Sequence, residues 1–431
     1  MNYFVFVLLI AFCPFGKTSD AKTLEMVHLL YRHGHRSPIY IYPKDPYQEN
    51  TSWPDGLGRL TQIGMNMEYD LGKFLKSRYI SQNSLVNSSY LYKEVYIRSS
   101  DVERCLQSAE TQLAGFYPPK GYQVWNTAIP WQPVPVHTVP ADEDAVLRPD
   151  DTVCPRLFEL EDDKKREPIY LQKQAQYKDF MKQLSNYTGM LVNFDNLWQI
   201  GDALKSEKVA GFKIPSWAQQ NWNKLLEITE WVFLNKYKGS DELGRLLGGT
   251  LLGIMNDNME KRKEGKYLDL LHKLYIFSGH DTSILSLTAA LDIEMSVPTF
   301  ASCMMVELYK DSGNNYFVEI HYRNDSSGST YPMKLKECDY QCPLAAFISL
   351  TKNRVPTNRD KECNFPKKTD FFTVYRLKIA SLLFVVTTVL LLMIIIILCI
   401  RRRAYFTRRM AYKVNSYGDD ESLIQEMKEE L

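Results

Sequence analysis

A histidine between two arginines, near the start of the chain, carries the clearest chemical signal in this sequence. Arg32, His33 and Arg36 lie in the segment 31–38, YRHGHRSP. An arginine guanidinium is planar, permanently charged and matched in shape to the oxygen atoms of a phosphate. A neutral imidazole held between two such groups is placed to attack phosphorus rather than to bind a metal. The alternative is a basic surface loop in which the histidine has no chemical role.

Two other segments carry similar groups, each after an apolar, strand-like run. Residues 94–101, EVYIRSSD, predict a short strand that ends at Arg98, with Asp101 as the N-cap of the next helix. Residues 274–282, LYIFSGHDT, predict a strand and a glycine, and then His280 and Asp281 at the start of another helix. The alternatives are that Arg98 is a solvated charge at a strand end and that Asp281 is only a helix cap.

These three segments predict one site, because each places its polar group where a strand ends. The segment with Arg32 and His33 follows the apolar run 24–31, which is typical of a buried strand. Open α/β sheets bind ligands at the carboxyl ends of their strands. We therefore expect the three strand ends to surround a phosphate together.

The sequence resembles the histidine acid phosphatases, in the branch with a large helical insertion. The likeness covers nearly all of the chain from the first strand to about Cys363. It implies an α/β fold, with a mainly parallel sheet flanked by helices, and an enzyme that hydrolyses phosphate monoesters through a phosphohistidine intermediate. The matching residues are Arg32-His33-Gly34 with Arg36 and Pro38, 56–61 with Gly64, 96–99, 131–133, 135–140 and 280–282.

The resemblance also implies a role for each site residue. His33 is the expected nucleophile and Asp281 the expected proton donor. No metal and no cofactor is expected. This branch usually has an acidic residue at the position of His35, so the chain departs from the pattern there. The residues expected to bind the phosphoryl group are Arg32, Arg36, Arg98 and His280.

The expected chemistry follows from the residue types. Guanidinium groups near His33 lower its pKa, so that its attacking nitrogen stays unprotonated. Arginines also stabilise the negative charge of the transition state. The leaving alkoxide needs a proton, which Asp281 can supply and later recover from water. A carboxyl group that starts protonated favours an acidic working pH, roughly 4 to 6.

The two ends of the chain predict a single-pass type I membrane protein. Residues 1–21 are typical of a signal peptide. Residues 379–400 are uncharged and long enough to cross a bilayer core of about 30 Å, and arginines follow at 401–403. Residues 22–375 are then lumenal or extracellular and 401–431 cytoplasmic. The predicted location is a lysosomal, endosomal or plasma membrane.

Short motifs agree with this topology. Four N-glycosylation sequons precede the membrane segment. In the tail, the segment 419–424 resembles an acidic dileucine signal, with Leu423 and Ile424 as apolar anchors for a sorting adaptor. A disordered tail without such a role is the alternative. The sequon asparagines are Asn50, Asn87, Asn186 and Asn324.

The pattern changes between residues 118 and 244, where prolines and polar helical stretches predict a helical cap over the site. Helices are expected near 168–184 and 217–236. The cap contains Trp131, Trp198 and Trp217. Such residues usually serve packing, whereas the resemblance implies a homodimer contact for some of them. Outside the cap, a helix after Thr61 is expected to pack on the sheet, and a hairpin over 304–322 to finish the sheet edge.

Six cysteines fall in the predicted lumenal part, and they allow 15 pairings. The resemblance implies that Cys338 pairs with Cys342 and Cys154 with Cys363. In the family, the cysteine at the position of Cys303 usually pairs with a second cysteine near residue 206, and residue 206 is a serine here. Either a Cys105–Cys303 bridge or two buried thiols therefore remain. The thiols are favoured because Cys105 lies on a core-facing helix.

Two other functions stay open. One is an enzyme specialised for inositol phosphates, lysophospholipid phosphates or nucleotides, because the cap would set substrate choice. The other is a catalytically weak receptor on the same scaffold, against which the presence of both His33 and Asp281 argues. Nucleic acid is not an expected partner, because 52 basic residues balance 51 acidic ones.

Overall fold

The computed structural model describes residues 22–268, 270–324, 328–364 and 368–416. Its internal contacts divide the chain into two units, one up to Phe365 and one from Pro366 onward. The predicted signal peptide and the predicted sorting motif at 419–424 lie outside the described residues.

One mixed sheet forms the centre of the first unit, in the strand order β2-β3-β1-β4-β5-β6, with β7 beside β5. The pairs β2–β3 and β3–β1 are parallel, and the remaining pairs are antiparallel. The predicted α/β class is confirmed, but the sheet is mixed and not mainly parallel, because β4, β5, β6 and β7 join it by antiparallel pairing. The parallel part, β2-β3-β1, is the part that carries the predicted site. The strands are β1 (Thr23–Arg32), β2 (Val95–Ser99), β3 (Leu274–Gly279), β4 (Cys303–Lys310), β5 (Tyr316–Arg323), β6 (Thr330–Met333) and β7 (Cys342–Pro343).

Some helices cover the sheet, and others belong to the long segment between β2 and β3. The helices are α1 (Glu49–Ser52), α2 (Gln62–Lys76), α3 (Glu103–Phe116), α4 (Pro155–Arg166), α5 (Pro168–Thr188), α6 (Leu197–Val209), α7 (Ser216–Gln220), α8 (Trp222–Asn235), α9 (Asp241–Leu247), α10 (Gly249–Glu264), α11 (Asp281–Leu291), α12 (Leu344–Thr351), α13 (Arg359–Glu362) and α14 (Lys368–Ser416). Shorter turns are the π-helical 77–82 and the 3₁₀-helical 121–123 and 352–354.

The three parallel strands end side by side. Arg32 is opposite Gly279, and Ser99 is opposite Ser278. Every residue of β3 is buried, as expected for a strand that is covered on both faces. The residues that directly follow β1, β2 and β3 therefore meet at one edge of the sheet, as the sequence predicted.

Two local predictions need correction. Helix α3 begins at Glu103 with Val102 as its N-cap, so Asp101 does not cap it. The predicted hairpin exists as β4 and β5, but β6 and β7 pair with the outer side of β5, so the hairpin does not finish the sheet.

The apolar stripe of helix α2 packs on the sheet, as predicted, and the helix also packs closely against α3. Leu71 and Leu75 are buried against the sheet. Glycines allow the two helices to approach, because a Cβ atom at Gly72 would lie 2.1 Å from the carbonyl oxygen of Gln112. A larger side chain there would force the helices apart.

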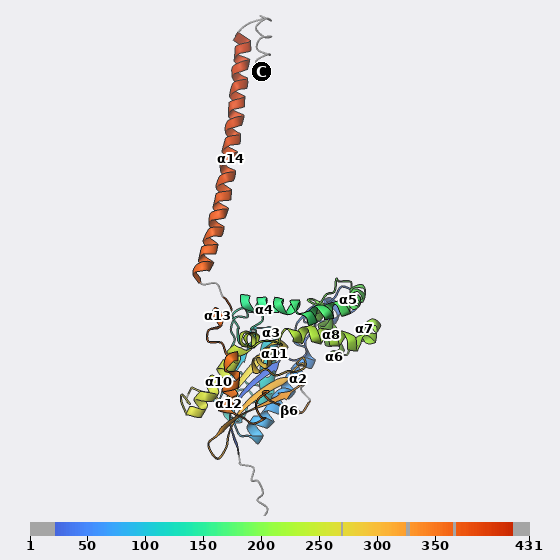
Figure 1. The fold of residues 1–431 in the computed structure, drawn as a ribbon, viewed down its shortest axis with the longest axis vertical. Helices are drawn as coiled ribbons and strands as arrows, with labels where there is room; N and C mark the ends of the chain where they lie inside the picture. The colour runs from blue at the N-terminus through green and yellow to red at the C-terminus, as the bar shows by residue number, and fades with distance from the viewer. Residues whose placement is uncertain (1–21, 269, 325–327, 365–367, 417–431) are drawn as a thin grey trace, which may run out of the picture. The chain divides into compact units, whose positions relative to one another are not determined.

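The predicted cap is helical from α4 to α9 and has its own apolar core, whereas residues 117–154 form loops with one short 3₁₀ turn. Figure 1 shows α5, α6, α7 and α8 in green beside the sheet. The predicted second helix is split at Asn221 into α7 and α8. The buried core of this segment includes Phe180, Leu197, Ile200 and Leu225.

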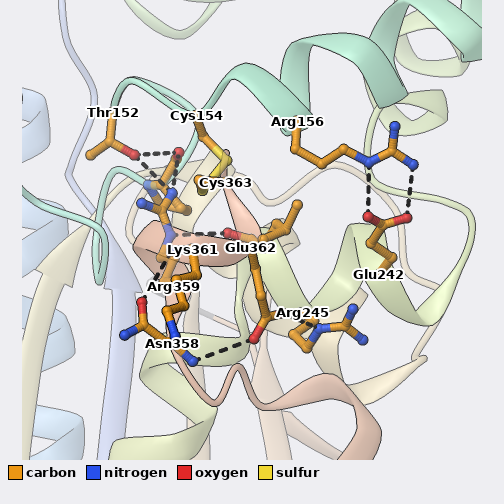
Figure 2. The surroundings of a disulfide bond; sticks show 12 residues. Thr152, Cys154, Arg156, Glu242, Arg245, Asn358, Arg359, Lys361, Glu362 and Cys363 are labelled. Carbon is orange, nitrogen blue, oxygen red and sulfur yellow. Dashed lines mark hydrogen bonds and ion pairs between the residues drawn. A yellow bond between two sulfur atoms is a disulfide. The ribbon is translucent and has the colours of Figure 1, made fainter. Parts of the chain in front are cut away.

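Disulfide bonds join Cys154 to Cys363 and Cys338 to Cys342, the two pairs that the resemblance implied. Figure 2 shows the first bond, between the residue before α4 and the residue after α13. An ion pair between Arg156 and Glu242 lies beside it. Cys105 and Cys303 are buried free thiols, so the alternative of a bridge between them is wrong.

Helix α14 contains the one stretch in the described residues that is long and apolar enough to cross a membrane, Lys378–Tyr412. The predicted span 379–400 lies within it. Length and composition make this helix a candidate membrane anchor.

We expect the bond between Cys154 and Cys363 to contribute more to stability than the one between Cys338 and Cys342. The first closes a sequence separation of 209 residues and the second a separation of 4. Replacing both Cys154 and Cys363 by serine should lower the free energy of unfolding by about 2–5 kcal/mol. Denaturant unfolding of the full-length chain in detergent measures this loss. An equal or larger loss in the matched serine variant of the 338–342 pair would contradict the expectation.

Candidate active site

The turn after β1 is fixed by close backbone contacts. His33 donates its backbone N–H to the carbonyl oxygen of Gly279, and its own carbonyl oxygen accepts from Ala301. The backbones of Gly34 and Gly64, which belongs to α2, lie so close together that a Cβ atom at Gly34 would be 2.3 Å from the Gly64 carbonyl oxygen. Both glycines are therefore needed to bring this turn against the helix.

The imidazole of His33 has a defined proton position. Its Nδ1 lies 2.9 Å from the carbonyl oxygen of Gly34. A carbonyl oxygen can only accept, so Nδ1 carries the proton and Nε2 keeps its lone pair. Burial, followed by the charges of Arg104, Arg32 and Arg36, holds the pKa of His33 well below 6.5. The ring is thus neutral at acidic pH, with a free nitrogen.

Arg32 and Arg36 are buried and oriented by acidic partners. Arg32 Nη2 lies 2.9 Å from an Asp281 carboxylate oxygen, and its guanidinium stacks 4.2 Å above the ring centre of Phe300. Arg36 donates to both carboxylate oxygens of Asp202, at 3.0 and 2.8 Å. Asp202 belongs to α6, so a residue from the inserted helices positions a side chain of the sheet edge.

Arg104, and not Arg98, lines the same cavity as His33, Arg32 and Arg36. Arg98 does not line the cavity, because its guanidinium pairs with the buried carboxylate of Asp144. Arg104, in the first turn of α3, lines the cavity and has the largest charge effect on the pKa of His33. No described acidic residue pairs with Arg104, whose guanidinium makes only a 3.5 Å hydrogen bond to the carbonyl oxygen of Gly58. The sequence signal for it was its place in the first turn of the helix after β2.

His280 and Asp281 lie at the end of β3, as predicted. His280 is the N-cap of α11, and its Nε2 is 2.9 Å from the Ser100 hydroxyl. Burial and then the positive charges of Arg104 and Arg148 lower the pKa of His280 well below 6.5. Asp281 is the first residue of α11 and accepts from the backbone N–H of Thr282. The N-cap is His280, so Asp281 is not merely a cap.

These side chains line one cavity of about 370 Å³. The sheet edge supplies Arg32, His33, Arg36, His280 and Asp281, and helix α3 supplies Arg104. The inserted helices and the loops beside them supply the opposite wall, which includes Trp198, Asp202 and Lys205. Trp198 is thus a cavity residue, whereas Trp131 lies exposed outside it.

His35 does not face the cavity. It is buried, and its Nε2 donates to the carbonyl oxygen of Ser206 at 2.9 Å, while Nδ1 lies 2.7 Å from the Thr61 hydroxyl. Burial is the main cause that lowers its pKa. His35 therefore holds the turn after β1 against α6 and does not line the cavity.

One group of potential metal ligands occurs among the described residues, away from the cavity. It consists of Glu307, Glu319 and His321. The carboxylate of Glu307 already accepts from Arg78 and from the hydroxyls of Tyr79 and Tyr309. Both of its oxygens are occupied, so the group does not fit a metal ion.

Comparison with known proteins gives one family. The model of the histidine phosphatase superfamily (branch 2) matches residues 23–323. The chain is 38% identical to the lysosomal acid phosphatase of Pongo abelii over 350 residues, which are 80% of this chain and 81% of that protein. It is 40% identical to the prostatic acid phosphatase of Homo sapiens over 349 residues, 80% of this chain and 88% of that protein.

The fold is also similar to solved structures of more distant sequence. The phytase from Citrobacter braakii has a TM-score of 0.62 and 18% identity, over 79% of this chain and 99% of that chain. Hafnia alvei phytase in complex with tartrate has a TM-score of 0.61 and 16% identity, over 80% and 99%. At these identities the likeness shows the shared fold alone.

We expect Arg104 to bind phosphate and Arg98 to support the fold. Arg104→Ala should weaken the binding of inorganic phosphate by about tenfold or more, because charge-assisted hydrogen bonds contribute roughly 1.5–3 kcal/mol. Arg98→Ala should instead lower the unfolding temperature, since it leaves Asp144 buried without its cation. Isothermal titration with phosphate and thermal unfolding of both full-length variants separate these effects. A larger loss of phosphate affinity in Arg98→Ala would refute the assignment.

Proposed function

The chain belongs to the histidine phosphatase superfamily, branch 2, and we propose that it is a membrane-anchored acid phosphatase in which His33 is the nucleophile. The observation that carries this proposal is the neutral, buried imidazole of His33, with Nε2 free, in a cavity lined by Arg32, Arg36 and Arg104. The substrates are phosphate monoesters, as the acid phosphatase names of the relatives suggest.

In the first step, Nε2 of His33 attacks phosphorus and forms a phosphohistidine, while the bond to the leaving alcohol breaks. Arg32, Arg36, Arg104 and His280 hold the phosphoryl oxygens. Because Arg36 is already fixed by the carboxylate of Asp202 and Arg32 is stacked on Phe300, little reorganisation is needed when the charge develops. Arg104 supplies a positive charge that no described carboxylate neutralises.

Asp281 is the proposed proton donor to the leaving alcohol. It is the carboxyl group directly after His280, it lines the cavity, and it lies within ion-pair distance of Arg32. In the second step the same carboxylate accepts a proton from the water that attacks the phosphohistidine. Phosphate then leaves, and both residues return to their starting states.

An acidic pH range suits this pair. His33 must be unprotonated, and its pKa lies well below 6.5, so acid does not switch off the nucleophile until far below that value. Asp281 must carry a proton in the first step, in which it protonates the leaving alcohol. The window between these two requirements is the range in which we expect activity.

The cellular setting is part of the proposal. The apolar helix α14, with basic residues after its apolar core, supports a type I orientation with the first unit in the lumen or outside the cell. Asn87 and Asn186 are exposed, as glycosylation requires, whereas the side chain of Asn50 lies outside the described ones. The proposal also includes a signal peptide at residues 1–21 and the binding of a sorting adaptor to residues 423–424.

A homodimer is proposed on the basis of exposed aromatic side chains. Tyr122, Trp125 and Trp131 are exposed, and the indole N–H of Trp125 donates to the carbonyl oxygen of Trp131. Such a surface is costly to leave in water and suits a second copy of the same chain.

The test compares leaving groups. The full-length chain in detergent should hydrolyse p-nitrophenyl phosphate and n-propyl phosphate at pH 5, with full activity in excess chelator. Asp281→Asn should lower kcat/KM for the propyl ester by about 100-fold or more, because a poor leaving group needs a proton. The nitrophenyl ester, whose phenolate leaves readily, should lose much less.

A matched control is Asp195→Asn, which removes another carboxylate of the same cavity. We expect it to affect both esters to the same extent. Absence of hydrolysis by the wild type would refute the proposed function. Equal losses of both esters in Asp281→Asn would refute the role of Asp281.

A further inference from the structure

Nearly every carboxylate that lines the cavity is paired with a cation. Asp150 is the exception among the described residues, because no described cation forms an ion pair with it. The pairs are Asp281 with Arg32, Asp202 with Arg36, Asp151 with Arg148, Asp195 with Lys165 and Glu230 with Lys205.

Asp150 has one carboxylate oxygen that is bonded and one that is not. Oδ2 accepts a hydrogen bond from the hydroxyl of the buried Tyr237, at 3.2 Å. Oδ1 is buried and has no hydrogen-bond partner in the protein. A buried acceptor without a partner costs free energy, which a donor from a ligand can recover.

The neighbours of Asp150 do not neutralise it. Arg148 is close in sequence, but its guanidinium donates to Asp151 instead. Arg104 is a cation that lines the same cavity and has no described acidic partner. Among the described lining residues, the cavity therefore offers the unpaired guanidinium of Arg104 and the unpaired carboxylate of Asp150. Lys236 also lines the cavity and forms no ion pair with Asp150.

A ligand that pairs with both Arg104 and Asp150 would carry one anionic group and one cationic group. We propose that Asp150 binds an ammonium group on the alcohol portion of the substrate, so that the enzyme prefers phosphate monoesters of amino alcohols. This inference rests on the proposed function, in which Arg104 and its neighbours bind the phosphoryl group. Asp150 then acts as a specificity residue and takes no part in bond breaking.

The ionisation of Asp150 makes the preference depend on pH. Burial and then the charge of Asp151 raise the pKa of Asp150 to about 6, with a smaller contribution from Asp281, while hydrogen bonding from its own backbone N–H and then from the Tyr237 hydroxyl acts in the opposite direction. Arg148 is the cation beside it in the loop. The carboxyl group is neutral below about pH 6 and charged above it, so attraction for an ammonium group grows from pH 5 to pH 7.

The experiment uses three esters of nearly equal size, O-phosphoethanolamine, 2-hydroxyethyl phosphate and n-propyl phosphate. At pH 7, where Asp150 is charged, the full-length wild type should show the highest kcat/KM for O-phosphoethanolamine. In Asp150→Asn the ratio of kcat/KM for O-phosphoethanolamine to that for n-propyl phosphate should fall by about tenfold, which is about 1.4 kcal/mol. Relative to Asp150→Asn, the wild-type ratio should rise between pH 5 and pH 7.

The matched control is Asp195→Asn, in which the lost carboxylate is exposed and paired with Lys165. It should keep the wild-type ratio. A wild type without preference for the ammonium ester would overturn the proposal without any variant. So would an unchanged ratio in Asp150→Asn, or an equal preference for the hydroxyl ester. If p-nitrophenyl phosphate is still hydrolysed in those cases, only this inference fails and the proposed function stands.

Discussion

The parallel pairing of β1 with β3 is the constraint on which the site depends. It places Arg32 opposite Gly279, although nearly 250 residues separate them in the sequence. His33 and His280 directly follow these two residues, and their ring centres are 5.6 Å apart. A shift of this register by one residue would move His33 relative to His280 and so separate the expected nucleophile from a group that is proposed to hold phosphate.

Burial of positive charge is the second requirement. A buried guanidinium is costly unless a carboxylate or a ligand pairs with it. Asp281 and Asp202 pair with Arg32 and Arg36 and also fix their orientation, which leaves Arg104 to interact with an anion. The inserted helices take part in this balance through Asp202, so they do more than cover the cavity. Through Asp202 they orient Arg36, which is proposed to bind the phosphoryl group.

Sequence patterns predicted strands β1 to β5, the turn around His33 and the position of His280 and Asp281, because these depend on local apolar runs and on the edge where parallel strands end. The short strands β6 and β7 were not predicted. The choice between Arg98 and Arg104 could not be predicted in this way. Both lie near the end of β2, and the partner that removes Arg98 from the cavity, Asp144, is 46 residues away. The unpaired state of Asp150 likewise depends on Tyr237, 87 residues away, and on the competing Asp151. Such long-range partners leave no periodic pattern in the sequence.

The most direct measurement of the central claim is the identity of the phosphorylated residue. The full-length enzyme is mixed with a radiolabelled phosphate monoester, stopped in alkaline detergent, digested and analysed by mass spectrometry. The account predicts a phosphate on His33 that is stable in base and lost in acid, and that is absent from His33→Ala. An acid-stable phosphate on serine or threonine, or a phosphate on another histidine, would contradict it.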